Sequence, residues 1–398
     1  MDVFVARQPI LTKQKKLFGY ELLFRTGMNN AFPDLDGDIA TSSLLSSSFF
    51  SSGIDKISGG RKSFINFTEA LLLQGTPSMF PQEKIMIEIL ENIKPTDEVI
   101  NACRELKKKG YTLALDDFEY SSEFNKLLSI IDVVKIDFMN TSANQIDEML
   151  GYLKPYKCRL LAEKIETYQD FERARKMGFA YFQGYFFSKP EILRNKDIPP
   201  GKMTVLRLIS EINRTEFNID KLEKLINQDV AVSYKLLKYL NSAYFARLSP
   251  LKSIRQAIAY LGERGIRLFV SLIATSQLGE DKPNELVRLS IVRARFLEKV
   301  GAHTGRDSGE MFMMGLFSLI DAMLDNPMDY LVSQLPLTEQ VTEALVHRGG
   351  ELAFYLELVE TFETGDWQRY EEIRDEIGLD EKLASEILLD AIEFTESY

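Results

Sequence analysis

Two adjacent carboxylates, Asp116 and Asp117, follow a hydrophobic run with the pattern of a buried strand. Alternate residues of a strand face opposite sides, so the two acids point to opposite faces. Acids at the end of a buried strand are costly unless a cation or another partner neutralises them. A turn is the other interpretation, because Asp is a common turn former. The pair indicates a cation site or a turn.

Polar residues occupy the same relative place in other strand-like runs. They are Asn66, Glu88, Lys135, Asp137, Glu163 and Gln183. In an α/β barrel the carboxyl ends of the strands converge on one mouth, where the active site lies. A ring of Asn, acids, Lys and Gln suits one or two hard divalent cations, which can hold a phosphate and activate water. The alternative is that each residue is a strand-end cap or a salt-bridge partner.

The first half of the chain alternates strands with capped helices. The expected strands are residues 3–6, 17–24, 63–67, 84–90, 111–118, 131–138, 159–165 and 180–182. Thr96 and Thr167 are expected to begin helices, which Gly110 and Gly178 end. The regular recurrence of strands after residue 63 predicts an α/β fold with a (β/α) TIM-like barrel.

A stiff, turn-forming segment, Ile-Pro-Pro-Gly at 198–201, marks the expected domain boundary. The prediction is a barrel domain over residues 1–198 and an all-helical domain over 202–398. The expected helices are residues 203–213, 218–228, 233–239, 253–261, 266–276, 284–302, 309–324, 337–347, 351–361, 366–378 and 381–398. These segments carry apolar residues at helical spacing.

The composition limits the classes of ligand that the protein is expected to bind. The 398 residues carry 48 basic and 59 acidic side chains, a net charge of −11, which argues against binding nucleic acid through its phosphates. A small anionic ligand stays compatible with this charge. The sequence lacks a long apolar span and a signal-peptide pattern, so we expect a cytoplasmic protein without membrane contact. Cys103 and Cys158 are expected to be reduced packing residues.

The helical half offers little chemistry of its own. His303 and His347 lack a second ligand at helical spacing and are expected at the surface or at helix ends. Five arginines allow a basic patch, although a solvated face or ion pairs within the domain is the preferred interpretation. They are Arg264, Arg267, Arg288, Arg293 and Arg295.

Residues 1–190 resemble the EAL domain, a barrel that hydrolyses the bacterial second messenger cyclic di-GMP. The matching segments, in chain order, are Arg-Gln-Pro-Ile at 7–10, Gly-Tyr-Glu-Leu-Leu-Phe-Arg at 19–25, Phe-Ile-Asn-Phe at 64–67, Ile-Glu-Ile-Leu-Glu at 87–91, Leu-Asp-Asp-Phe at 115–118, Val-Lys-Ile-Asp at 134–137, Ala-Glu-Lys-Ile-Glu at 162–166 and Gln-Gly-Tyr-Phe-Phe-Ser-Lys-Pro at 183–190. As an ordered set they are highly specific.

The resemblance implies a role for each matching residue. Four residues would bind Mg²⁺ or Mn²⁺: Glu21, Asn66, Glu88 and Asp116. Asp117 would bind metal and the attacking water, Lys135 would hold that water or the scissile phosphate, and Glu163 would complete the metal and base set. Gln183 would support the site, Arg25 would contact a ligand phosphate, and Glu91 would anchor the loop after Asp117.

One loop departs from the family pattern. Active relatives follow Asp-Asp-Phe with Gly-Thr-Gly-Tyr-Ser-Ser, whereas here Glu119 to Ser122 form a segment two residues shorter without glycine. In the family this loop places the second Asp and joins barrels into dimers, so a homodimer stays open here. Its backbone needs unusual angles, which glycine adopts most readily. The stretch from Glu21 to Asn66 is also short for the family.

The second half resembles the HDOD domain, a relative of the HD hydrolases. The resemblance lies in residues 236–245 and 254–262. Ser318 and Leu319 stand where catalytic relatives have metal-binding His and Asp, and leucine has no donor atom. We therefore expect no metal and no catalysis in this half, which would contact a signalling protein partner.

Three interpretations follow. The preferred one is a cyclic di-GMP-related bacterial signalling protein whose degenerate barrel binds nucleotide or metal with weak or no hydrolysis. The alternative is an active metal-dependent phosphodiesterase giving linear pGpG, which the retained acids and Lys135 favour. The third is a scaffold that binds neither; the acidic ring opposes it, because bare carboxylates at one mouth repel each other.

Overall fold

The computed structural model describes residues 5–24, 54–189, 198–212 and 253–396, together with residues 220, 223, 226, 227 and 234. The chain divides into two compact units. The first comprises Met1–Phe187 with Glu360–Tyr370, and the second comprises Ser188–Val359 with Glu371–Tyr398.

The first unit is a closed barrel in which consecutive strands are neighbours, as expected for the TIM-like class. Its strands are β1 (Val5–Thr12), β2 (Leu17–Phe24), β3 (Lys62–Phe67), β4 (Ile85–Ile89), β5 (Thr112–Leu115), β6 (Val133–Asp137), β7 (Arg159–Glu163) and β8 (Tyr181–Gln183). From β2 to β8 neighbouring strands are parallel, whereas β1 pairs antiparallel with both β2 and β8. The barrel is therefore closed by its one reversed strand.

Most of the strand prediction is confirmed, with two differences. The expected strand at 3–6 ends too early, since β1 continues through Arg7 and Pro9 to Thr12, while residues 3 and 4 lie outside the described residues. Polar residues and a proline concealed this strand, but its ladder partners on two sides hold it extended. The strand expected at 111–118 ends at Leu115, so Asp116 and Asp117 follow β5 instead of lying within it.

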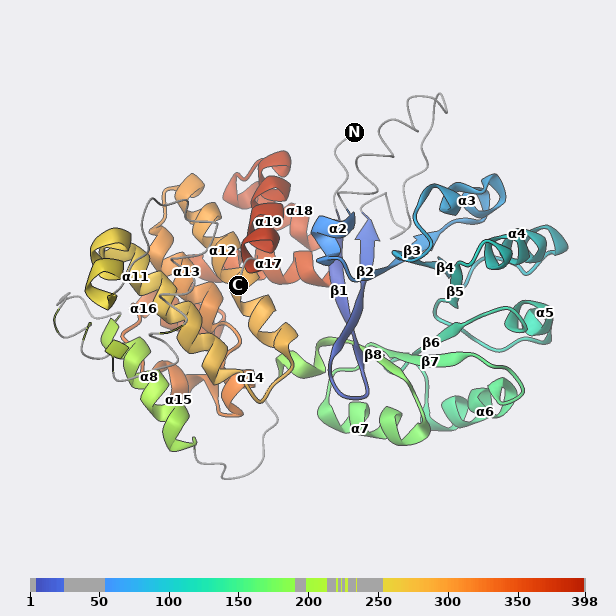
Figure 1. Ribbon diagram of the computed structural model, residues 1–398, viewed down its shortest axis with the longest axis horizontal. Helices are drawn as coiled ribbons and strands as arrows, with labels where there is room; N and C mark the ends of the chain where they lie inside the picture. Colours follow the sequence, from blue (N-terminus) through green and yellow to red (C-terminus); the bar gives the residue numbers. More distant parts are fainter. Residues whose placement is uncertain are drawn as a thin grey trace. The chain divides into compact units, whose positions relative to one another are not determined.

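Helices α2 (Ile54–Ser58), α3 (Glu69–Gln74), α4 (Asp97–Lys108), α5 (Asn125–Leu128), α6 (Ala143–Leu153) and α7 (Tyr168–Met177) belong to this unit. Helices α3 to α7 lie outside the strands (Figure 1). Thr96 and Thr167 cap α4 and α7, as predicted, by accepting hydrogen bonds from backbone amides in the first turn. Gly178 ends α7 in the left-handed conformation.

An apolar layer fills the barrel interior. Its buried members are Ile10, Phe64, Met86, Ala114, Val133, Leu161 and Tyr181. Each parallel strand from β3 to β8 contributes one of these residues, and a polar residue follows two positions later. Residues i and i+2 of a strand face the same side, so the polar side chains form the next layer toward the carboxyl ends of the strands.

The described part of the second unit is helical. Its helices are α8 (Pro200–Ile212), α11 (Ile254–Leu278), α12 (Asn284–Thr304), α13 (Ser308–Phe317), α14 (Ile320–Leu324), α15 (Met328–Val332), α16 (Glu339–His347), α17 (Glu351–Thr364), α18 (Trp367–Ile377) and α19 (Glu381–Glu396). Residues 360–364 of α17 and residues 367–370 of α18 are assigned to the first unit. The helices expected at 218–228 and 233–239, and the family segment at 236–245, lie largely outside the described residues.

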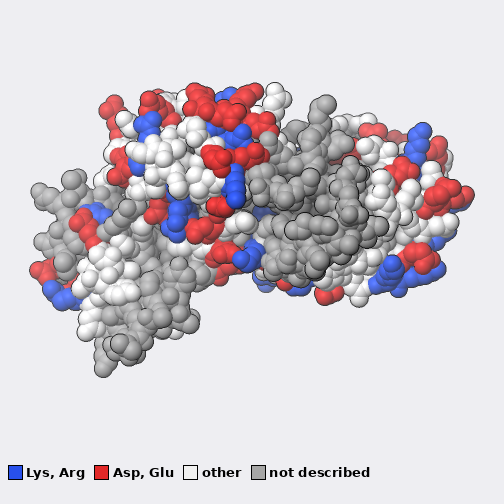
Figure 2. Space-filling view, turned by 90° about the horizontal axis from the view of Figure 1, so that it is seen from above, with Lys and Arg blue, Asp and Glu red and all other residues white. Residues whose placement is uncertain are grey.

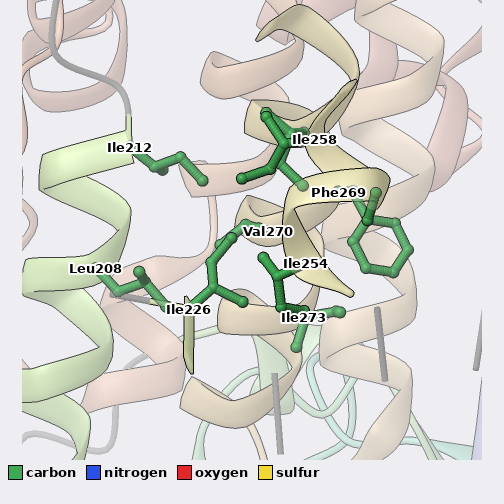
Figure 3. Close-up of a cluster of buried hydrophobic side chains, with 10 residues drawn as sticks. Leu208, Ile212, Ile226, Ile254, Ile258, Phe269, Val270 and Ile273 are labelled. Carbon is green, nitrogen blue, oxygen red and sulfur yellow. The ribbon is translucent and has the colours of Figure 1, made fainter. Parts of the chain in front are cut away.

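One apolar cluster joins α8 to α11. Leu208 and Ile212 of α8 point toward Ile258 and Val270 of α11, with Ile226 between them (Figure 3). The two helices expected at 253–261 and 266–276 are assigned as one element, α11, in which Gly262 breaks the helical geometry with φ 68° and ψ 177°. Only glycine adopts that conformation readily, so the break belongs to the sequence. Among the described helices, none is long and apolar enough to cross a membrane.

Candidate active site at the barrel mouth

The predicted polar residues meet at the carboxyl ends of the strands. Glu21, Asn66, Glu88, Lys135, Glu163 and Gln183 lie in β2, β3, β4, β6, β7 and β8, and all are buried. Asp116 follows β5, and its backbone N–H donates to the carbonyl of Ile89 on the neighbouring strand. The barrel thus brings together side chains that are far apart in the sequence.

Lys135 lies among four carboxylates. Its Nζ is 2.7 Å from Asp116 Oδ1, 2.8 Å from Glu88 Oε1 and Glu163 Oε1, and 3.2 Å from Glu21 Oε2. The ammonium group has three protons, so it cannot donate a well-directed hydrogen bond to all four acids. Glu88 Oε1 receives the ion pair without a hydrogen bond. Four acids against one ammonium leave the ring with an excess of negative charge.

The charges shift the pKa values in the direction that this imbalance predicts. Burial raises the pKa of Glu88 well above its ordinary value, and Lys135 only partly offsets this effect. Burial also raises the pKa of Glu163, with Lys135 opposing and Asp116 and Glu21 adding to the rise. Burial alone would lower the pKa of Lys135, but the surrounding carboxylates outweigh it and the pKa is raised. The lysine therefore stays charged, and proton uptake falls to the acids.

Amide side chains orient Glu21. Asn66 Nδ2 donates to Glu21 Oε1 at 3.2 Å, and Gln183 Nε2 donates to Glu21 Oε2 at 2.7 Å. Gln183 Nε2 also donates to Gln8 Oε1 at 2.9 Å. Sequence reasoning missed Gln8, because β1 runs in the opposite direction and its mouth residue precedes the interior residue Ile10. The pattern of alternation in β1 is the signal that could have identified it.

Glycine lets the chain turn directly behind Gln183. Gly184 has φ 134°, and a Cβ there would lie 2.3 Å from the carbonyl oxygen of Ile165. The amide of Ile165 donates to the carbonyl of Gln183, so the two segments lie in contact. This close approach fixes the end of β8, and with it the amide that holds Glu21.

Asp117 is separate from the ring around Lys135. Its backbone has φ 35°, a region that non-glycine residues rarely adopt, and its side chain is 39% exposed. Lys164 Nζ contacts Asp117 Oδ2 at 3.3 Å and Asp137 Oδ2 at 2.6 Å. Lys164 was missed by sequence reasoning, although its place beside Glu163 at the end of β7 puts it at the same mouth. Its pKa is raised; burial opposes the rise and Asp137 and Asp117 cause it.

Two residues implied by the family resemblance stand apart. Arg25 lies outside the described residues. Glu91 is exposed in the turn after β4, and its carboxylate has no hydrogen bond or ion pair with any residue that the structure describes. Glu91 therefore makes no hydrogen bond or ion pair with the ring.

The residues of the ring fit divalent metal ions. Buried carboxylate and amide oxygens of the ring lack a hydrogen-bond partner at Glu88 Oε2, Glu163 Oε2 and Gln183 Oε1. Outside the ring, the same holds for Asp117 Oδ1. Oxygen atoms of this kind are the ligands that Mg²⁺ and Mn²⁺ prefer, and orphaned buried acceptors call for a cation. Among the described residues, no group of three or more acids, His or Cys has the spacing of a ready metal site. The ammonium of Lys135 lies where the acids approach each other.

The second unit has different polar chemistry around Ser318 and Leu319. Ser318 is buried, its Oγ donates to the carbonyl of Gly315 at 2.8 Å and accepts from Arg293 Nη1 at 3.2 Å. Leu319 is buried and apolar. His303 and His347 are exposed near the ends of α12 and α16, as predicted.

The preferred interpretation of the arginines is confirmed for those whose ion pairs are described. Arg267 pairs with Glu263, Arg288 with Glu396, and Arg295 with Glu298 and Asp390. The side chain of Arg264 lies outside the described residues. On the face shown in Figure 2, the described basic side chains are interspersed with acidic ones.

The fold and the mouth define the class: an α/β barrel with a ring of acids around a buried lysine at its strand ends. A profile of the EAL domain matches residues 50–190, and a profile of the HDOD domain matches residues 198–324. Cyclic di-GMP phosphodiesterase CdgJ of Vibrio cholerae is 41% identical over 393 residues, which cover 98% of this chain and 91% of that protein. The chain belongs to the family of proteins that join an EAL domain to an HDOD domain.

A second curated protein and a solved structure are also similar to this chain. The uncharacterized protein YuxH of Bacillus subtilis is 37% identical over 406 residues, covering 99% of this chain and 98% of that protein. The crystal structure of the Bacillus subtilis YkuI protein, an EAL-domain protein in complex with substrate cyclic di-GMP and calcium, is 17% identical with a TM-score of 0.37. It covers 57% of this chain and 72% of that one.

Proposed function

We propose that this chain is a metal-dependent cyclic di-GMP phosphodiesterase that gives linear pGpG. The observation that carries the proposal is the complete acidic ring around Lys135, with four carboxylate oxygens within 3.2 Å of its Nζ. A barrel that had lost catalysis would have no reason to keep this many buried acids, because each is costly to ionise. The relative with the phosphodiesterase name, which matches along nearly the whole chain, supports the same reading.

The proposal assigns work to the chain's own residues. Glu21, Asn66, Glu88, Asp116 and Asp117 would hold Mg²⁺ or Mn²⁺. When bound, such cations polarise a phosphodiester and lower the pKa of water. Lys135 would orient the water or the scissile phosphate from the centre of the ring, and Glu163 would accept a proton. Gln183 would keep Glu21 in position through its hydrogen bond.

The helical half would serve as a protein-binding module without a metal of its own. The buried contact between Arg293 and Ser318 supports this assignment, because Ser318 stands where catalytic relatives have a metal ligand. A guanidinium beside that position disfavours a second positive charge. The boundary of the two domains is proposed at residues 198–202, where the HDOD profile begins and α8 starts.

The test is turnover of cyclic di-GMP by the purified full chain with Mn²⁺, with pGpG separated and quantified. Glu21→Ala and Asp116→Ala should each abolish product formation. Glu105→Gln is the matched control, since Glu105 is an exposed acid on α4 paired with Lys108. Absence of turnover in the native chain, with the Glu105→Gln variant equally inactive, would overturn the proposal.

A second candidate is binding of cyclic di-GMP without turnover, which was the preference from the sequence. The position of Asp117 favours it, because this residue is half-exposed and contacts Lys164 instead of the ring. Calorimetric titration with cyclic di-GMP and Ca²⁺ separates the two: saturable binding beside zero turnover in Mn²⁺ would favour the binding protein.

A further inference from the structure

An aromatic contact lies close to the half-exposed acid of the mouth. Tyr120 stacks on Tyr152 of α6, with ring centroids 4.0 Å apart and an interplanar angle of 5°. Tyr120 lies three residues after Asp117, in the segment that leads to α5. A stack of this geometry holds both rings face to face, so it fixes the course of the segment relative to α6.

A second contact joins the same segment to its surroundings. Asn125 Oδ1 accepts hydrogen bonds from Tyr120 Oη at 3.2 Å and from Tyr156 Oη at 2.9 Å. Asn125 begins α5, and Tyr156 follows α6. The two hydroxyl groups therefore tie the segment, α5 and the end of α6 to one acceptor.

The contacts also extend back to the acid itself. Phe118, the residue after Asp117, is buried, its amide donates to the carbonyl of Lys135, and its ring meets Phe124 edge to face. The segment is thus held at Phe118 and again at Tyr120. Asp116 and Asp117 lie between β5 and these contacts. The left-handed backbone of Asp117 costs free energy and persists only when its surroundings enforce it.

We propose that the stack of Tyr120 on Tyr152 is the device that positions Asp117 for metal binding and catalysis. The inference rests on the proposed function for its catalytic part. The segment from Asp117 to Asn125 contains no glycine, so its shape cannot come from glycine's conformational freedom. Tyr120 and Tyr152 are positioning residues, because they act through Asp117 and make no contact with it.

The experiment compares Tyr152→Ala with Tyr152→Phe in the full chain. Phenylalanine keeps the stacked ring, whereas alanine removes it. Three quantities are measured: hydrogen exchange of the backbone amides at 118–122, Mn²⁺ affinity by electron paramagnetic resonance, and kcat and KM for cyclic di-GMP. Tyr330→Ala is the matched control, because Tyr330 is 48% exposed on α15 in the second unit and Tyr152 is 43% exposed.

We expect Tyr152→Ala to speed exchange at 118–122, weaken Mn²⁺ binding and lower kcat, each on the order of tenfold, with little change in KM. Tyr152→Phe should restore all three, and Tyr120→Leu should repeat the losses. Unchanged exchange and Mn²⁺ affinity in Tyr152→Ala would overturn the proposal. So would a raised KM with unchanged Mn²⁺ affinity, since that pattern marks a substrate contact.

The outcome is separable from that of the proposed function. If the native chain shows no turnover, the phosphodiesterase proposal fails, yet exchange and Mn²⁺ affinity still decide whether the stack holds Asp117. If the native chain turns over and Tyr152→Ala matches it in every quantity, the positioning proposal alone fails.

Discussion

The barrel mouth and the helical unit both bury charged side chains, but the charges are balanced differently in the two regions. At the mouth one ammonium, that of Lys135, faces four carboxylates. In the helical unit Lys282 pairs with Asp325, both almost fully buried, and Arg293 donates to the neutral Ser318. The buried pair of Lys282 and Asp325 carries one charge of each sign, so it has no excess of negative charge.

The difference separates buried charges that stabilise the fold from buried charges that can bind a ligand. A matched pair repays part of its desolvation cost by itself and belongs to the architecture of the unit. An excess of acids raises their pKa values and leaves oxygen atoms without partners, as at Glu88. On the proposed function, cations from solution neutralise this excess of negative charge. The same chemical change should therefore have opposite consequences in the two regions.

The largest expected effect is on turnover when the ring loses one acid. Glu88→Gln should lower kcat/KM on the order of a thousandfold, about 4 kcal/mol in the barrier, because it removes a proposed metal ligand. In metal-free buffer the same variant should unfold at a temperature equal to or above that of the native chain, since it removes a buried charge. A clear loss of metal-free stability would show that Glu88 is architectural.

In the helical unit, removing one charged side chain is expected to lower stability, the opposite of the effect of Glu88→Gln without metal. Lys282→Met should destabilise that unit by about 3 kcal/mol, because Asp325 then stays buried beside an apolar side chain. Urea denaturation followed by circular dichroism measures the loss. Adding Asp325→Asn should recover part of it; a double variant no better than the single one would contradict the assignment of a matched pair.

Metal should stabilise the barrel and leave the helical unit unchanged. At a Mn²⁺ concentration of about 100 times Kd, binding adds about 2.7 kcal/mol to the unfolding free energy of the unit that holds the site. Calorimetry should show the shift in the native chain and lose it in Asp116→Ala. Elemental analysis of that variant should find no stoichiometric Zn²⁺, Fe²⁺ or Mn²⁺, and bound metal would place a second site in the chain.

The smallest expected effect is on stability at different pH values, and it concerns Asp321 in α14. Burial raises the pKa of Asp321 above its ordinary value of 3.8, and Arg348 and Arg293 oppose the rise. A raised folded-state pKa gives stability that is present below 3.8 and lost as the pH rises through the folded-state value. Asp321→Asn should therefore stabilise the chain at neutral pH by about 1 kcal/mol and be neutral in acid. Denaturation at several pH values, with the exposed Asp329→Asn as control, measures this difference.

Local patterns were enough to predict the strands, the caps and the polar residues of the mouth. Alternation in Phe64 to Asn66 and in Val133 to Lys135 marks a face, and a face is a property of neighbouring residues. The threonine caps are equally local, since their partners lie three residues away. The continuation of β1 from Arg7 to Thr12 could not be found in this way, because ladders to β2 and β8 hold it extended.

Contacts across the fold were beyond the reach of the pattern. Lys135 meets Glu21 across 114 positions of sequence, and no local signal says which acid the ammonium will face. The stack of Tyr120 on Tyr152 likewise depends on the packing of a loop against a helix. From the sequence alone, the short loop after Asp117 favoured a degenerate barrel. On the positioning proposal, the stack replaces the glycines that are missing from this loop.

The reversed strand β1 has a consequence for how the barrel forms. Its pairing of Ile10 with Gln183 joins residues from opposite ends of the domain, the kind of high-contact-order closure that slows folding. Until β8 is made, β1 can pair only with β2, and its other edge stays open as a template for aggregation. During synthesis this edge should remain unpaired until nearly the whole first domain has emerged from the ribosome. The ring therefore cannot be complete before that last pairing, because Gln183 joins it only with β8.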